Sequence, residues 1–161
     1  MSNSFTVGIS DLKVVRAPDV LVTYALGSCV GICLYDPMNR IGGMAHIMLP
    51  SSQETGMKGD GYKFADTGIA LLVKKMEQTG ARSPLMSAKI AGGAQMFASI
   101  TNSTIANIGQ RNVSAVKNIL AQMKIPIVAE DTGSNYGRTL YFYAEDGRMK
   151  IKSAQRGEWI W

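Results

Sequence analysis

The sequence predicts an α+β protein, an α/β sandwich in which antiparallel or mixed β-sheets carry two main helices. Three observations favour this class. Short strand-like apolar runs outnumber helical patterns, two segments repeat apolar residues at helical spacing, and turn signals join neighbouring strand-like runs near both ends of the chain.

The composition predicts one compact domain spanning residues 1–161, because 46% of the residues are hydrophobic and 18% are charged. No internal repeat and no Pro- or Ser-rich linker divides the chain. The net charge of +5 is scattered, with no Arg/Lys cluster among aromatic residues, so we expect no nucleic-acid partner. The N-terminal residues resemble no secretory signal and no apolar run suits a membrane span, which predicts a cytoplasmic protein.

The first third of the chain reads as strands. We expect them at residues 5–9, 20–26, 30–35 and 41–49, followed by a polar, Gly-rich loop at residues 51–61.

The first predicted helix covers residues 62–79, with Asp60 as a possible N-cap and Gly80 as the C-terminal stop. Four apolar residues recur on one of its faces: Ile69, Leu72, Val73 and Met76.

The second predicted helix covers residues 112–124 and ends before Pro126. Its apolar face comprises Val113, Val116, Leu120 and Met123. Further strands are expected at residues 87–91, 127–130, 139–144 and 149–153, with Asp146-Gly147 as the turn between the last two. The Gly-rich stretches lack phosphate-loop spacing, so we interpret them as turns and points of close packing.

A candidate site emerges where two of these strands form a hairpin. The four-residue turn "PMNR" would pair Asp36 with Ile41, and in that register Gly31 lies opposite His46. Cys29 then becomes a diagonal neighbour of His46, the only histidine, on the same face. Gly31, without a side chain, would leave space for a substrate to approach the sulfur.

A cysteine beside a histidine suits nucleophilic attack on an amide or ester carbonyl, because the imidazole can take the thiol proton. Thr23 lies on the preceding strand and could orient the imidazole through either its hydroxyl or its main-chain carbonyl. The backbone N–H groups of Gly27, Ser28 and Val30 are candidates for stabilising an oxyanion.

The same residues allow other interpretations. A buried cysteine is often only a small apolar residue, and that is our expectation for Cys33. A zinc site made by Cys29, Cys33 and His46 lacks an evident fourth ligand, so no metal is expected. A redox pair of the two cysteines is disfavoured because a strand holds them too far apart for a disulfide.

The order of several motifs resembles the CheD family, chemoreceptor glutamine deamidases of bacterial and archaeal chemotaxis. The motifs are "LGSCVGICLYD", "GGMAHIMLP", "KFADTGIALLV", "AKIAGGAQMF", "IGQRNVSAV" and "IPIVAEDTGSNYGR". One departure is Ser134, where the family pattern leads us to expect a second glycine.

The resemblance implies an enzyme, a protein-glutamine glutaminase that converts glutamines on chemoreceptor cytoplasmic helices to glutamate and releases ammonia. It implies a catalytic triad of Cys29, His46 and Thr23, no cofactor, a possible receptor methylesterase activity, and a fold similar to the catalytic domain of cytotoxic necrotizing factor toxins. It also implies action at receptor arrays on the inner face of the membrane.

The resemblance also implies a partner, CheC, a phosphatase of the response regulator CheY. The alternative function is therefore a weakly catalytic or non-catalytic adaptor that binds CheC and stimulates its phosphatase activity. When free of partners, the protein is expected to be a monomer.

Overall fold

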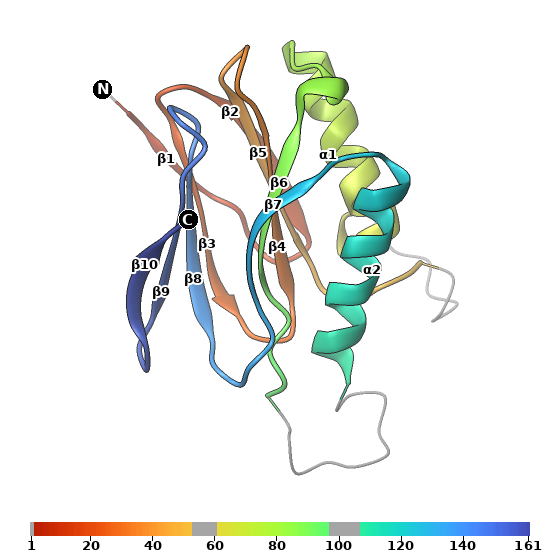
Figure 1. Ribbon diagram of the computed structural model, residues 1–161, viewed down its shortest axis with the longest axis vertical. Helices are drawn as coiled ribbons and strands as arrows, with labels where there is room; N and C mark the ends of the chain where they lie inside the picture. The colour runs from red at the N-terminus through yellow and green to blue at the C-terminus, as the bar shows by residue number, and fades with distance from the viewer. Residues whose placement is uncertain (1, 53–60, 97–106) are drawn as a thin grey trace.

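The molecule has three layers: two helices, a first sheet and a second sheet (Figure 1). The computed structural model describes residues 2–52, 61–96 and 107–161. The helices cover one face of the first sheet, and the second sheet packs on its other face. This arrangement confirms the predicted α+β class.

The first sheet, called the central sheet here, has the strand order β2-β5-β4-β6-β7. Its strands are β2 (Asp11–Arg16), β4 (Val30–Asp36), β5 (Ile41–Ile47), β6 (Ser87–Gly92) and β7 (Ile127–Thr132). The second sheet, called the outer sheet, has the order β1-β3-β8-β9-β10. Its strands are β1 (Ser4–Thr6), β3 (Val20–Leu26), β8 (Arg138–Tyr143), β9 (Met149–Ser153) and β10 (Gly157–Ile160).

Two apolar cores hold the layers together. The core beneath the helices is built from alternate residues of the central strands, such as Val30, Ile32 and Leu34 of β4. The core between the sheets takes the intervening positions, including Cys33, together with Leu140 and Phe142 of β8. The inner strands β4 and β5 are therefore buried on both faces, which explains their nearly continuous apolar sequences.

The hairpin of β4 and β5 has the predicted register. Asp36 pairs with Ile41 and Gly31 pairs with His46. The buried carboxylate of Asp36 stabilises the turn, because it accepts hydrogen bonds from the backbone N–H groups of Met38 (3.0 Å) and Asn39 (3.2 Å).

Both predicted helices are present. α1 (Ala65–Thr79) buries the four predicted apolar residues and ends at Gly80, whose φ of 117° suits glycine. It begins three residues later than predicted, after a short 3₁₀ turn, η1 (Gly61–Lys63); a second one, η2 (Ser83–Leu85), precedes β6. The predicted N-cap, Asp60, lies outside the described residues. α2 (Ile108–Gln122) begins four residues before the predicted start and buries Val116 and Leu120.

The ends of the chain differ most from the prediction. The strand expected at residues 5–9 was wrong in extent, since β1 is shorter and Ile9 is exposed. Two strands were missed: β2, which mixes charged and apolar residues, and β10, which pairs with β9 at the edge of the outer sheet. Both are defined by long-range or edge pairing rather than by a strong local pattern.

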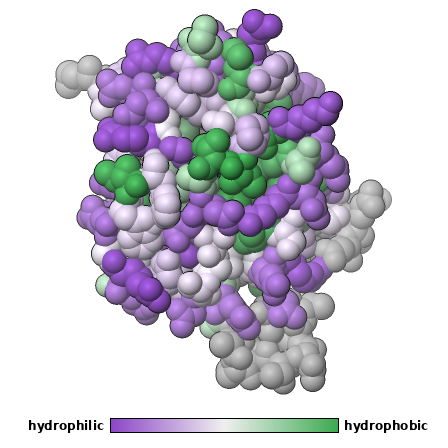
Figure 2. All heavy atoms as spheres, in the orientation of Figure 1, coloured by the Kyte–Doolittle hydropathy of each residue, from purple (hydrophilic) through white to green (hydrophobic). Residues whose placement is uncertain are grey.

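The face shown in Figure 2 is mostly hydrophilic, with hydrophobic residues gathered near its centre, over β7. β7 is an edge strand of the central sheet, and its Val128 is exposed. Among the described residues, no helix has the length and apolar character needed to cross a membrane.

Candidate active site

Cys29 lies in the short loop that leads from β3 in the outer sheet to β4 in the central sheet. The loop is held by three consecutive carbonyl groups. The oxygen of Gly27 accepts from Ala94 N (2.8 Å), that of Ser28 from Asn112 Nδ2 (3.0 Å) and that of Cys29 from Gly93 N (2.8 Å). The nucleophile candidate therefore stands on a fixed backbone and is half-buried.

A glycine makes this anchoring possible. Gly92 has a φ of 112°, and a Cβ at this position would lie only 2.3 Å from the carbonyl oxygen of Cys29. The Gly-rich stretch at the end of β6 thus serves close packing, as the sequence predicted.

The structure brings Thr23 and His46 together. Thr23 Oγ1 lies 2.7 Å from His46 Nδ1 and 2.7 Å from the carbonyl oxygen of Val7. Because a carbonyl oxygen can only accept, the hydroxyl donates to Val7 and accepts from the N–H of His46 Nδ1. The contact with the imidazole is made by the hydroxyl of Thr23, one of the two groups that the sequence left open.

This hydrogen-bond chain fixes the tautomer of His46. With the proton on Nδ1, the other ring nitrogen, Nε2, carries a free lone pair, and it has no hydrogen-bond partner among the described residues. Cys29 packs against the core between the two sheets, and His46 contacts Thr23 of the outer sheet, so both side chains lie on the side of the central sheet that faces the outer sheet. Nε2 is thus the nitrogen available to take a proton.

Burial controls the charge of both groups. Desolvation lowers the pKa of His46 to about 4. Desolvation also raises the pKa of the Cys29 thiol, although its own backbone N–H acts in the opposite direction. At neutral pH the resting pair is therefore a neutral thiol and a neutral imidazole, a state suited to general-base catalysis.

Gly31 does not provide the substrate space that the sequence suggested. A Cβ at this position would lie 2.6 Å from Cδ2 of Leu140 and 3.3 Å from Cδ1 of Leu26. The bare strand position is filled by side chains of the outer sheet, so its role is the close approach of the two sheets.

The three oxyanion candidates differ in their backbone hydrogen bonds. The N–H of Gly27 donates to Ala25 O (3.0 Å), and Val30 is paired in the ladders of β4. Ser28 lies between them, outside any strand.

Cys33 is fully buried in the core between the sheets and is a free cysteine, as predicted. Burial strongly raises the pKa of its thiol, which keeps it protonated and inert. Within residues 2–52, 61–96 and 107–161, no three His, Cys, Asp or Glu side chains lie close enough together to hold a metal ion.

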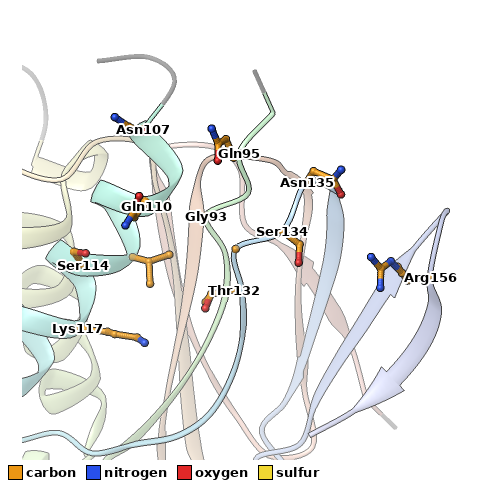
Figure 3. Close-up of a pocket in the computed structure, with 12 residues that line it drawn as sticks. Gly93, Gln95, Asn107, Gln110, Ser114, Lys117, Thr132, Ser134, Asn135 and Arg156 are labelled. Atoms are coloured by element: carbon orange, nitrogen blue, oxygen red, sulfur yellow. The ribbon is translucent and has the colours of Figure 1, made fainter. Parts of the chain in front are cut away.

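A polar cleft of about 540 Å³ opens beside the site, between α2 and the segments that follow β6 and β7 (Figure 3). Amide, hydroxyl and cationic side chains line it, among them Gln95, Gln110, Ser114, Lys117, Thr132 and Arg156. Gly93 connects the two places, because it lines the cleft and its N–H donates to the carbonyl oxygen of Cys29. None of Cys29, His46 and Thr23 lines this cleft.

One site residue was missed from the sequence. Asn112 is fully buried on α2 and donates to the backbone of the Cys29 loop. The available signal was its place on the apolar face of the helix, four residues before Val116, where an uncompensated amide is costly.

Comparison with known proteins identifies relatives of this sequence. Residues 48–153 match the family model CheD, described as CheD chemotactic sensory transduction. The chain is 52% identical over 156 residues to a probable chemoreceptor glutamine deamidase CheD of Caldanaerobacter subterraneus subsp. tengcongensis, covering 97% of this chain and 96% of that protein. It is 47% identical over 160 residues to the chemoreceptor glutamine deamidase CheD of Halalkalibacterium halodurans, covering 98% of each.

Among solved structures, the fold resembles Neisseria meningitidis protein NMB0706, of the family DUF152. The TM-score is 0.52 and the sequence identity 11%, covering 97% of this chain and 74% of that one. The expected similarity to the catalytic domain of cytotoxic necrotizing factor toxins is not confirmed.

Proposed function

The chain belongs to the CheD family, and from that premise we propose that it is a protein-glutamine deamidase acting on chemoreceptors. The observation that carries the proposal is the Thr23–His46 hydrogen bond of 2.7 Å, which leaves a buried, unprotonated Nε2 on the side of the central sheet against which Cys29 also packs. Close relatives named chemoreceptor glutamine deamidases support the substrate.

The proposed first step is acylation of the thiol. His46 Nε2 takes the proton of Cys29 as Sγ attacks the glutamine amide carbon, and the carbonyl oxygen becomes an oxyanion. The imidazolium then passes that proton to the amide nitrogen, the C–N bond breaks, and ammonia leaves a thioester.

The proposed second step is hydrolysis. His46 Nε2 takes a proton from a water molecule as its oxygen attacks the thioester carbon. The C–S bond then breaks, the sulfur recovers the proton, and glutamate is released. Thr23 and Val7 stabilise the imidazolium in both steps, because each hydrogen bond strengthens as positive charge develops on the ring.

We place the oxyanion at the N–H groups of Ser28 and Cys29. In a trans peptide the N–H points opposite to the preceding carbonyl. The carbonyls of Gly27 and Ser28 accept hydrogen bonds from Ala94 and Asn112. The N–H groups of the same two peptides, which belong to Ser28 and Cys29, therefore point away from Ala94 and Asn112.

The test is mass spectrometry of a chemoreceptor cytoplasmic fragment incubated with wild type, Cys29→Ala and Cys33→Ala. Wild type and Cys33→Ala should convert specific glutamines of the fragment to glutamate, whereas Cys29→Ala should not. Conversion by Cys29→Ala would exclude the thioester route.

The same acylation chemistry extends to receptor glutamyl methyl esters, with methanol leaving in place of ammonia. The alternative function, an adaptor that binds CheC and stimulates its CheY-phosphate phosphatase activity, predicts that wild type and Cys29→Ala alter the phosphatase rate equally while neither converts glutamine. For the deamidase we propose a monomer, since one chain supplies all three catalytic side chains. For either role we propose a protein of the cytoplasm that associates with receptor arrays.

A further inference from the structure

Asn112 joins two backbone segments that are 20 residues apart in the sequence. Its Nδ2 donates to the carbonyl oxygen of Ser28 (3.0 Å) and to that of Met48 (2.9 Å). Ser28 immediately precedes Cys29, and Met48 is two residues beyond His46. A single buried amide therefore links the chain on either side of the candidate reacting pair.

This link lies at the end of the β4–β5 ladder, which includes His46 but not Cys29. The ladder of β4 and β5 ends at Val30 and Ile47. Cys29 is beyond its end, so ladder hydrogen bonds between these two strands do not fix the sulfur relative to the imidazole. Asn112 supplies a bridge just beyond the ladder, between Ser28, two residues before Val30, and Met48, one residue after Ile47.

The fit of α2 against the sheet brings the amide to this place. Gly109, one turn before Asn112, packs so closely that a Cβ there would lie 2.3 Å from the carbonyl oxygen of Ala94. The two carbonyl partners also fix the orientation of the amide, because its oxygen would repel them. Oδ1 is left buried, without a partner among the described residues.

We propose that Asn112 is a positioning residue, which holds the Ser28–Cys29 peptide and the end of β5 in the arrangement that lets His46 act on Cys29. The proposal rests on the proposed function for its catalytic part. Its geometric part, the position of the Ser28–Cys29 peptide relative to the end of β5, is independent of the substrate.

The test compares Asn112→Asp, which keeps the shape but turns the donor into an acceptor, with Asn118→Asp, a matched change at an exposed position of α2. Two rates are measured well below each variant's melting temperature: alkylation of Cys29 by iodoacetamide across pH 6–9, followed by mass spectrometry, and deamidation of the receptor fragment.

For Asn112→Asp we expect alkylation at neutral pH to slow about tenfold and kcat to fall about a hundredfold with little change in KM, because misplacement by about 1 Å is that costly. Asn118→Asp should match wild type in both rates. Asn112→Ala, assayed in parallel, should show the same losses and covers the case in which Asn112→Asp does not fold.

Equal rates in the folded Asn112 and Asn118 variants, even with a lowered melting temperature, would overturn the proposal and leave Asn112 a purely structural role. If wild type does not deamidate, the proposed function fails, but the alkylation rates still decide the placement of Cys29 by Asn112.

Discussion

Thr23 and His46 are hydrogen-bonded across the two sheets, although their strands, β3 and β5, never pair. Thr23 is fully buried in the outer sheet and His46 is fully buried in the central sheet. The carbonyl oxygen of Val7, in the segment between β1 and β2, completes the chain at 2.7 Å. The histidine is thus oriented by a layer of the protein different from the one that carries it.

Replacing Thr23 with Val should remove the support of the imidazole. The variant removes the hydroxyl that is hydrogen-bonded to two buried groups, the N–H of His46 Nδ1 and the carbonyl oxygen of Val7. We expect kcat/KM for glutamine conversion to fall on the order of 10²-fold and the free energy of unfolding to fall by about 2 kcal/mol. Thr23→Ser keeps the hydroxyl and should retain most of the activity; equal losses in both variants would contradict the role of the hydroxyl.

The buried imidazole should make stability depend on pH. The pKa of His46 is about 4 in the folded protein, against an ordinary value of 6.5. Between these values the unfolded chain binds a proton that the folded protein does not, so the free energy of unfolding decreases as the pH falls from 6.5 to 4. The full loss amounts to about 3 kcal/mol.

Urea denaturation of wild type and His46→Gln at several pH values isolates this contribution, because glutamine does not titrate. Other acidic groups affect both proteins alike, and the difference between the two curves should vary mainly between pH 4 and 6.5. A difference that is constant across this range would show that the imidazole is not held neutral.

Gly31→Ala should disturb the packing of the two sheets. The added methyl group would overlap Leu140, whose Cδ2 lies 2.6 Å from the position of the Cβ. We expect a loss of about 1–3 kcal/mol in the free energy of unfolding. Gly8→Ala, with no atom within 4 Å of its Cβ, is the matched control. Combining Gly31→Ala with Leu140→Ala should relieve the overlap; additive losses would indicate that the strain lies elsewhere.

The polar cleft of Figure 3 is expected to contact the receptor helix beside the substrate glutamine. The reason is that Gly93, which lines the cleft, is hydrogen-bonded to the carbonyl oxygen of Cys29. Ser114→Trp fills this cleft from α2 and should raise KM for the receptor fragment about tenfold with kcat nearly unchanged. Asn118→Trp, on the same helix but not lining this cleft, should leave KM as in wild type. A fall in kcat alone would argue that the cleft acts on the chemical step instead.

Sequence reasoning succeeded where the interactions are local. Alternation along residues 30–35 and a four-residue turn predicted the register of the β4–β5 hairpin, including the pairing of Gly31 with His46. Helical spacing identified the buried face of α1 for the same reason.

It failed where one segment meets another far along the chain. Nothing local shows that the chain changes sheets between β3 and β4, at the loop that carries Cys29. The bare position at Gly31 was interpreted as open space because Leu140, which fills it, is more than 100 residues away. Asn112 was overlooked for the same reason, since its partners lie on β-sheet loops.

Because His46 belongs to the central sheet and Thr23 to the outer one, the hydrogen bond between them depends on the thickness of the apolar core that separates the two sheets. Leu26, Leu140 and Phe142 belong to that core and keep the two sheets apart. A smaller or larger side chain at one of these positions is expected to misplace the histidine at temperatures where the protein is still folded. The catalytic rate would then respond to the distance between the sheets more strongly than the melting temperature does.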